Sequence, residues 1–160
     1  MIYSNHQNES SEGGNKKMSV KVIAVSHGRY SEGLVDSVQM LVGEQENLVY
    51  YGLFPEETVA TLREKLKAEL DATEEGMEVL FISDLFHGSP FNTIVDLMRD
   101  YDFYHLTGVN LPSAVLIMMN RYADMSAEEI CRSVMKEAPD TVKYVNDMFD
   151  ADDDEDEEDE

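Results

Sequence analysis

Positive charge is scarce in this sequence, and long apolar runs are absent. Twelve Lys and Arg residues stand against 34 Asp and Glu residues, so the formal net charge is −22. We expect no nucleic-acid partner and no anionic membrane partner, because neither supplies the cations that an acidic surface attracts. No segment approaches the roughly 20 apolar residues that a helix needs to span a membrane.

Cysteine is also scarce. The single one, Cys131, excludes an internal disulfide, and this usage favours a cytoplasmic location. Because Cys131 lies in a helical pattern, we expect a small buried residue there and not a nucleophile.

The two ends of the chain differ in composition from its middle. Residues 1–17 are polar and lack the apolar centre of a secretory signal, so we expect a disordered leader ahead of Met18, which offers a second start. Ten of the eleven residues in 150–160 are acidic, a composition typical of a disordered tail. We therefore expect one domain over residues 18–149, long enough to bury a proper core.

Apolar segments that alternate with helical patterns predict a parallel sheet. Residues 20–25 form a nearly unbroken apolar run rich in valine, as in strands that are buried on both faces. Further strands are expected at residues 48–51, 77–83 and 104–107. The helical patterns cover residues 31–42, 55–70, 89–98, 113–122 and 126–137. This order predicts an α/β fold, a doubly wound three-layer sandwich with four parallel strands.

Helix ends and apolar stripes add detail to this prediction. Ser31 is the expected N-cap of the first helix, and Pro55 is expected to open the second. Ser126 begins a capping-box pattern at the last helix. Several methionines follow the apolar stripes and are expected to fill the core: Met40, Met98, Met118, Met119 and Met135.

Residues 141–145 are rich in strand formers, but the sheet is complete before they arrive. We therefore predict a fifth strand there, either at the sheet edge or exchanged with a second copy of the chain. An exchanged strand would cover an open sheet edge and hold a homodimer together.

Polar residues follow the first and third expected strands at the points where these strands end. His27, between Ser26 and Gly28, follows the first strand, and Asp84 follows the third. The turn at Asn110 follows the fourth. Because the carboxyl ends of parallel strands meet at one edge of a sheet, these side chains can converge. A carboxylate that accepts a hydrogen bond from one imidazole nitrogen leaves the other nitrogen bare as a nucleophile.

A helix start lies beside these residues. Pro90 is expected at the first helical position, with Ser89 as the cap before it. Backbone N–H groups at Gly88, Ser89 and Phe91, together with the Ser89 hydroxyl, could hold the oxygens of a phosphoryl group.

Each of these features also has a purely structural interpretation. His27 could be a surface-loop histidine, Asp84 a loop cap, and Ser89 with Pro90 an ordinary helix start. His87 and His105 could be imagined as metal ligands together with His27, but we expect no metal, because loop and strand histidines are usually solvated or packed. We expect no cofactor either: the sequence has no phosphate-binding P-loop, no GxGxxG, no CxxC and no HExxH.

Taken together, the motifs resemble the IIA component of the mannose type of the bacterial phosphoenolpyruvate-dependent sugar phosphotransferase system. The resemblance covers about residues 20–148. It is carried by Val25-Ser26-His27-Gly28, Val42-Gly43-Glu44-Gln45-Glu46-Asn47, Asp84 with Gly88-Ser89-Pro90-Phe91-Asn92, and Gly108-Val109-Asn110-Leu111-Pro112.

The resemblance implies a role for several residues. His27 would be phosphorylated, Asp84 would orient it, and Ser89 would help to hold the phosphate. The strand at 141–145 would be exchanged in a homodimer. The chain departs from the family pattern at His87, where a glycine is usual, at Ser113, where methionine is common, and in its acidic tail.

The resemblance therefore predicts a cytoplasmic phosphotransferase that carries a phosphoryl group on His27. The histidine phosphocarrier protein would be the donor and a IIB component the acceptor, with the membrane IIC and IID components served indirectly. The first alternative is a phosphocarrier of the dihydroxyacetone-kinase type, against which residues 88–92 argue. The second is a regulatory binding module of the same fold. The sequence does not disclose which sugar is carried.

Overall fold

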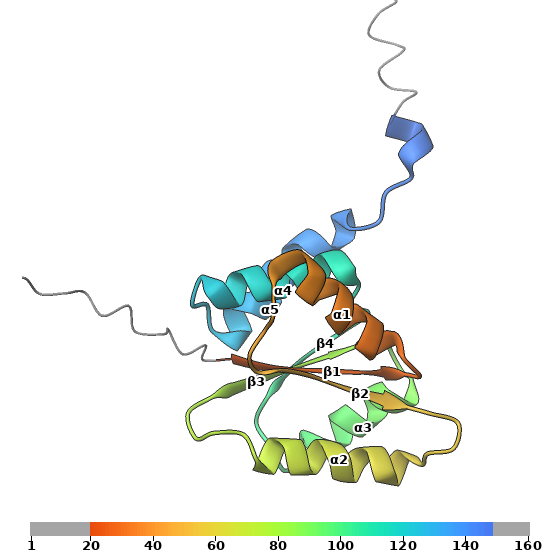
Figure 1. Ribbon diagram of the computed structural model, residues 1–160, viewed down its shortest axis with the longest axis vertical. Coiled ribbons are helices and arrows are strands. Elements are labelled where there is room, and N and C mark those ends of the chain that lie inside the picture. The colour runs from red at the N-terminus through yellow and green to blue at the C-terminus, as the bar shows by residue number, and fades with distance from the viewer. Residues whose placement is uncertain (1–19, 149–160) are drawn as a thin grey trace, which may run out of the picture.

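A parallel sheet forms the middle layer of the molecule (Figure 1). The computed structural model describes residues 20–148. Their strands pair in the order β2-β1-β3-β4, and every pairing is parallel. The strands are β1 (Val20–His27), β2 (Leu48–Leu53), β3 (Glu78–Ser83) and β4 (Tyr104–Thr107). The four predicted strands are therefore confirmed, with shifts of one or two residues at their ends.

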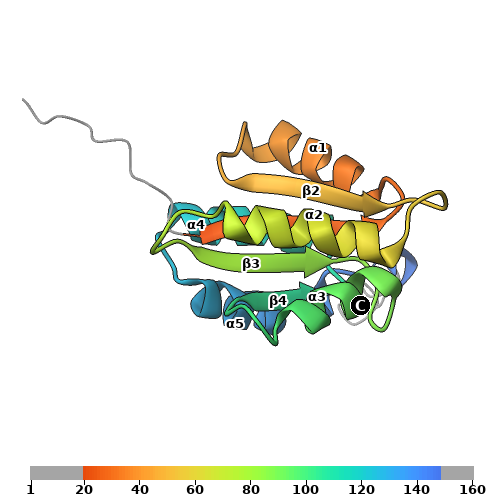
Figure 2. The ribbon, with the colours of Figure 1, turned by 90° about the horizontal axis from the view of Figure 1, so that it is seen from below.

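Helices cover both faces of this sheet, as the predicted three-layer sandwich requires (Figures 1 and 2). One face carries α1 (Tyr30–Val42), α4 (Leu111–Tyr122) and α5 (Ala127–Glu137), and the other carries α2 (Val59–Asp71) and α3 (Ser89–Leu97). A short 3-10 helix, η1 (Ala138–Asp140), follows α5. Within residues 20–148, no helix combines the length and apolar character needed to cross a membrane.

The central strand β1 is buried on both of its faces. Val22 and Ala24 pack with α1, α4 and α5, while Ile23 and Val25 pack with α2 and α3. Each of these four side chains is at most 1% exposed. This double burial explains why β1 is an unbroken apolar run without polar alternation.

The chain passes from β1 to β2 on one side and later returns to place β3 on the other side of β1. The strand order thus reverses between β1 and β3. Ligand sites of open α/β sheets lie beyond the carboxyl ends of the strands at such a reversal. His27 ends β1 and Asp84 follows β3, so both lie at this point.

The start of α1 differs from the prediction. Ser31 is not the N-cap: the helix begins at Tyr30, and Ser31 is buried inside the first turn. Its N–H donates to Ser26 Oγ at 2.7 Å, and its hydroxyl donates to the Tyr51 carbonyl at 2.9 Å. The Ser26 side chain therefore satisfies an N–H of the first turn, which is what a capping side chain does.

The predicted start of α5 is confirmed, and that of α2 is wrong. Ser126 and Glu129 form the predicted capping box of α5. Pro55 does not open α2, because the helix begins at Val59 behind Thr58, whose Oγ1 accepts from the Thr61 N–H. Thr58 supplies a side-chain acceptor for the first turn, which proline lacks.

Most of the methionines are not core residues. Met118 is 1% exposed, but its neighbour Met119 is 54% exposed. The prediction was also wrong for Met40, Met98 and Met135, which are exposed. Adjacent helical positions differ by about 100° around the axis, so only one of two neighbouring residues faces the sheet.

The expected fifth strand is not formed in the single chain. Residues 141–144 have no regular structure, and residues 145–148 are helical. After η1 this segment leads away from the sheet, so no strand edge lies beside it (Figure 1). A strand needs a paired neighbour, and one chain does not supply it here. The predicted leader (1–17) and the predicted tail (150–160) lie outside the described residues.

Gly52 allows β2 to lie close to the turn that follows His27. A Cβ atom built at Gly52 would lie 2.2 Å from the Gly28 carbonyl oxygen. The Gly28 N–H donates to the Leu53 carbonyl at 2.9 Å, which fixes this approach. Backbone atoms on both sides leave little room for relief.

We therefore expect Gly52→Ala to lower the free energy of unfolding by about 1–3 kcal/mol, as other overpacking substitutions do. Gly33 is a matched control, because it lies exposed in α1 and its added Cβ would meet no atom within 4 Å. Gly33→Ala should raise stability by roughly 0.5–1 kcal/mol. Urea denaturation of both variants measures this. Equal stability of Gly52→Ala and the wild type would contradict the close approach.

Candidate active site

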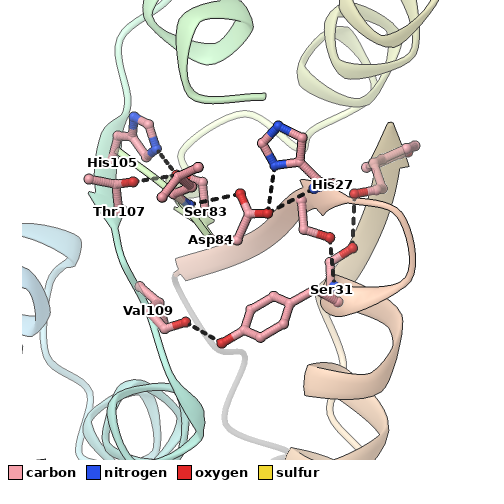
Figure 3. Close-up of polar contacts among 11 residues, drawn as sticks. His27, Ser31, Ser83, Asp84, His105, Thr107 and Val109 are labelled. Atoms are coloured by element: carbon pink, nitrogen blue, oxygen red, sulfur yellow. Dashed lines mark hydrogen bonds and ion pairs between the residues drawn. The ribbon is translucent and has the colours of Figure 1, made fainter. Parts of the chain in front are cut away.

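His27 and Asp84 form a hydrogen-bonded pair at the carboxyl edge of the sheet (Figure 3). Asp84 Oδ2 lies 2.9 Å from His27 Nδ1 and also accepts from the His27 backbone N–H at 2.8 Å. The other carboxylate oxygen accepts from the Leu85 N–H at 2.8 Å. The contact expected from the strand order is therefore present, and Asp84 holds both the backbone and the ring of His27.

The hydrogen bond decides which ring nitrogen can react. A carboxylate only accepts, so Nδ1 must carry the proton that it donates to Asp84. In the neutral ring Nε2 is then the basic nitrogen. Within the described residues Nε2 has no hydrogen-bond partner. The ring is also accessible, because the His27 side chain is 46% exposed, against 15% for Asp84.

The absence of a side chain at Gly88 leaves room for the His27 imidazole. A Cβ atom at Gly88 would lie 2.7 Å from His27 Cε1 and 3.3 Å from Nε2. The ring therefore lies against the backbone at the start of α3. A glycine is needed there for space, since the Gly88 φ of −76° is open to any residue.

The start of α3 differs by one residue from the prediction. Gly88 is the N-cap, so Ser89 is the first helical residue and Pro90 the second. The Gly88 N–H already points to the Leu85 carbonyl, at 3.4 Å. The N–H groups of Ser89 and Phe91 lie in the first turn, where helices offer no internal acceptor. Of the three predicted N–H groups, these two remain available for an anion.

The three supporting residues of the prediction lie at this edge, but structural contacts occupy two of them. Ser26 is fully buried and bonded to Ser31. Asn110 caps α4 by accepting from the Ser113 N–H at 3.1 Å, and its Nδ2 donates to Thr141 Oγ1 at 2.8 Å. Gly28 has a φ of +51°, the left-handed turn that glycine favours directly after His27.

No sequence pattern indicates a role for Tyr30, whose hydroxyl donates to the Val109 carbonyl at 2.8 Å (Figure 3). Burial, and then the charge of Asp84, raise the pKa of Tyr30. The phenol therefore stays protonated and lies near Asp84. Helical spacing alone marks Tyr30 only as a first-turn residue.

The remaining candidate groups do not join the pair. Burial raises the pKa of the Cys131 thiol to about 11, so it is protonated at neutral pH and a poor nucleophile. His87 has a φ of +62° in the loop before α3 and packs against Phe86. His105 bonds to Ser83. Among residues 20–148, no three His, Cys, Asp or Glu side chains gather closely enough to hold a metal ion.

Comparison with known proteins identifies the family. Residues 21–135 match the family model EIIA-man, described as "PTS system fructose IIA component". A mannose-specific EIIAB component of Escherichia coli K12 is 34% identical over 127 residues, which are 79% of this chain and 39% of that protein. This chain thus spans about two fifths of the length of that relative.

Two further relatives are matched by this chain over most of their own length. A fructose-specific EIIA component of Bacillus subtilis 168 is 34% identical over 103 residues, 64% of this chain and 70% of that protein. A mannose/sorbose-specific IIA subunit from Enterococcus faecalis superposes with a TM-score of 0.70 at 26% identity, covering 79% of this chain and 94% of that one.

Fold and site together define a parallel α/β domain with an accessible histidine–aspartate pair at the reversal of strand order. The family match covers more than half of the chain. The chain therefore belongs to the EIIA-man family and is a mannose-type IIA component of a sugar phosphotransferase system.

Proposed function

We propose that this chain is a phosphoryl carrier whose acceptor atom is His27 Nε2. The observation that carries the proposal is a half-exposed imidazole ring whose Nδ1 is held by Asp84, whose Nε2 has no partner among the described residues, and whose edge lies against the start of α3. A nucleophile, a group that orients it and a set of anion-binding N–H groups are thus adjacent.

The proposed step exchanges one N–P bond for another. The lone pair of Nε2 attacks the phosphorus of a donor phosphohistidine, and the donor imidazole leaves with the electron pair of the old N–P bond. The His27 ring, which keeps its Nδ1 proton, gains positive charge as the new bond forms. Asp84, at 2.9 Å from Nδ1, stabilises that charge.

The phosphoryl oxygens need donors of their own. The Ser89 and Phe91 N–H groups at the start of α3 face no intrahelical acceptor, and the helix dipole favours an anion there. We assign the oxygens to these two groups and to the Ser89 hydroxyl, with the Gly88 backbone beside them. Ser26, Gly28 and Asn110 would then support the site by fixing the turns.

The partners follow from the family. We propose the histidine phosphocarrier protein as donor, a IIB component as acceptor, and a cytoplasmic location, with the membrane IIC and IID components reached only through IIB. An accessible histidine at the surface suits transfer between proteins, since the donor and the acceptor must both reach the His27 ring. Phosphate transfer to a purified IIB component would distinguish this role from a dihydroxyacetone-type carrier and from a regulatory module.

We also propose that the C-terminal segment is exchanged in a homodimer. The outer edge of β4 is unpaired within residues 20–148. Val142, Tyr144 and Val145 are exposed by 81%, 68% and 54%. In a dimer, the exposed strand formers of one chain could pair with the open β4 edge of the other chain, and the reverse.

The first prediction of this function is that His27 takes one phosphate. Incubation with phosphoenolpyruvate, the general first enzyme and the phosphocarrier should add one acid-labile, base-stable phosphate per chain, because the half-exposed His27 ring lies against the start of α3 with Nε2 unpartnered among the described residues. Mass spectrometry of the His27→Ala and His87→Asn variants measures this. His87→Asn should be labelled like the wild type, as Asn tolerates its positive φ. Full labelling of His27→Ala would refute the assignment.

Replacing Asp84 should slow the transfer without abolishing it. Asp84→Asn keeps the shape of the side chain but removes the charge that stabilises the imidazolium, so we expect a loss on the order of a hundredfold in rate. Rapid quench from the same donor measures it, with the exposed Asp36→Asn as control. A rate within about threefold of wild type would show that Asp84 is only a loop cap.

Truncation tests the exchanged segment. A chain that ends after Pro139 should lose the dimer, because it lacks residues 141–145. A chain that ends after residue 149 loses only the acidic tail and should keep it. Light scattering gives both masses. A well-folded dimer of the shorter chain would rule out the exchange.

A further inference from the structure

His105 forms a hydrogen bond with Ser83, the last residue of β3, which directly precedes Asp84 (Figure 3). Its Nε2 lies 2.8 Å from Ser83 Oγ, and the Ser83 hydroxyl donates to Thr107 Oγ1 at 3.0 Å. Since a serine has one proton and Ser83 gives it to Thr107, the Ser83 oxygen accepts from His105. With the Ser83 proton directed at Thr107, this assignment places the His105 proton on Nε2.

The same ring contacts the start of α3. Phe91, in the first turn, packs over His105 with a ring-centroid distance of 5.3 Å. Phe91 also packs edge-on against Phe86 in the loop, at 5.0 Å. His105 thus contacts two parts of the site that are remote in sequence: the end of β3 and the first turn of α3, which begins beside His27.

This arrangement is costly if it serves packing alone. His105 pairs with Phe81 in the sheet register, on the face that packs against α2 and α3. An aliphatic side chain could fill the position without a polar atom to satisfy. Ser83 is 3% exposed, and burial lowers the pKa of His105 to about 4, so the ring is neutral at neutral pH. A buried polar group whose hydrogen bonds are satisfied fixes the orientation of its neighbours more than it adds to the free energy of unfolding.

The end of β3 is held closely by these contacts. The Ser83 carbonyl accepts from the Val109 N–H at 3.1 Å while its side chain bonds to His105. The next residue is Asp84, whose Oδ2 orients the His27 ring. A shift of Ser83 would therefore move the carboxylate relative to Nδ1.

We propose that His105 is a positioning residue, which holds Asp84 through Ser83 and the start of α3 through Phe91 in one fixed geometry around His27. It does not touch the phosphoryl group. The kinetic part of its test rests on the proposed carrier function, whereas the spectroscopic part needs only the folded chain.

The spectroscopic test follows the His27 ring by NMR in the full-length chain with 15N-labelled histidines. The wild type should show one His27 tautomer, protonated on Nδ1 with Nε2 bare. In His105→Leu, which lacks the donor, we expect mixed or exchange-broadened His27 signals. His105→Gln should restore the single tautomer, because its amide places an N–H near the position of Nε2.

The kinetic test measures phosphoryl transfer from the phosphocarrier to the same variants. His105→Leu should lower the transfer rate constant by about tenfold at an unchanged KM for the donor, since a misplaced group costs rate more than binding. His105→Gln should recover most of it. Val79→Ala, on the same face of β3 but remote from the site, is the control for lost stability and should change neither readout.

Ser83→Ala gives a second test that does not alter His105. It leaves the His105 Nε2–H without its acceptor and should therefore give the same mixed His27 tautomers and slower transfer that we expect for His105→Leu. This second variant keeps the proposal testable if His105→Leu folds poorly. A single Nδ1-protonated His27 in both variants, with transfer like the wild type, would overturn the proposal. If the wild type and His105→Gln both show the single His27 tautomer but neither accepts phosphate, the carrier function is refuted. The NMR comparison with His105→Leu then decides the positioning role by itself.

Discussion

One carboxylate sets the geometry on which the site depends. Asp84 Oδ2 accepts from both the backbone and the ring of His27, and Oδ1 accepts from the next backbone N–H. These three bonds fix the carboxylate, and the carboxylate fixes the ring. Because Nδ1 donates to it, the free lone pair of the neutral ring is on Nε2.

The fold brings these groups together through a single topological feature. β1 and β3 are neighbours at the reversal of strand order, so residues that end or follow them meet although they lie 57 positions apart. Two glycines then allow close contact: Gly52 accommodates the turn after His27, and Gly88 accommodates the ring itself. The start of α3 lies beside the ring for the same reason. Sheet topology therefore supplies the proximity, and the absence of two Cβ atoms supplies the space.

The strands and the pairing of His27 with Asp84 could be predicted because they depend on local patterns and on the geometry of parallel sheets. Other features depend on neighbours that no local pattern reveals. Ser31 looks like a cap, but the Tyr51 carbonyl draws its hydroxyl into the interior. The bond between Ser83 and His105 requires the register of β3 with β4, which no spacing in the sequence gives. Residues 141–145 have strand composition, but in the single chain they lead away from the sheet and do not pair with the open edge of β4.

The most direct test of this account is the position of the phosphate on the His27 ring. In the enzymatically phosphorylated chain with 15N-labelled histidines, two-dimensional NMR distinguishes the two ring nitrogens by their shifts and couplings. We expect phosphorus on Nε2, with Nδ1 still protonated and bonded to Asp84. Phosphorus on Nδ1 would contradict it, because that nitrogen could not then donate to the carboxylate.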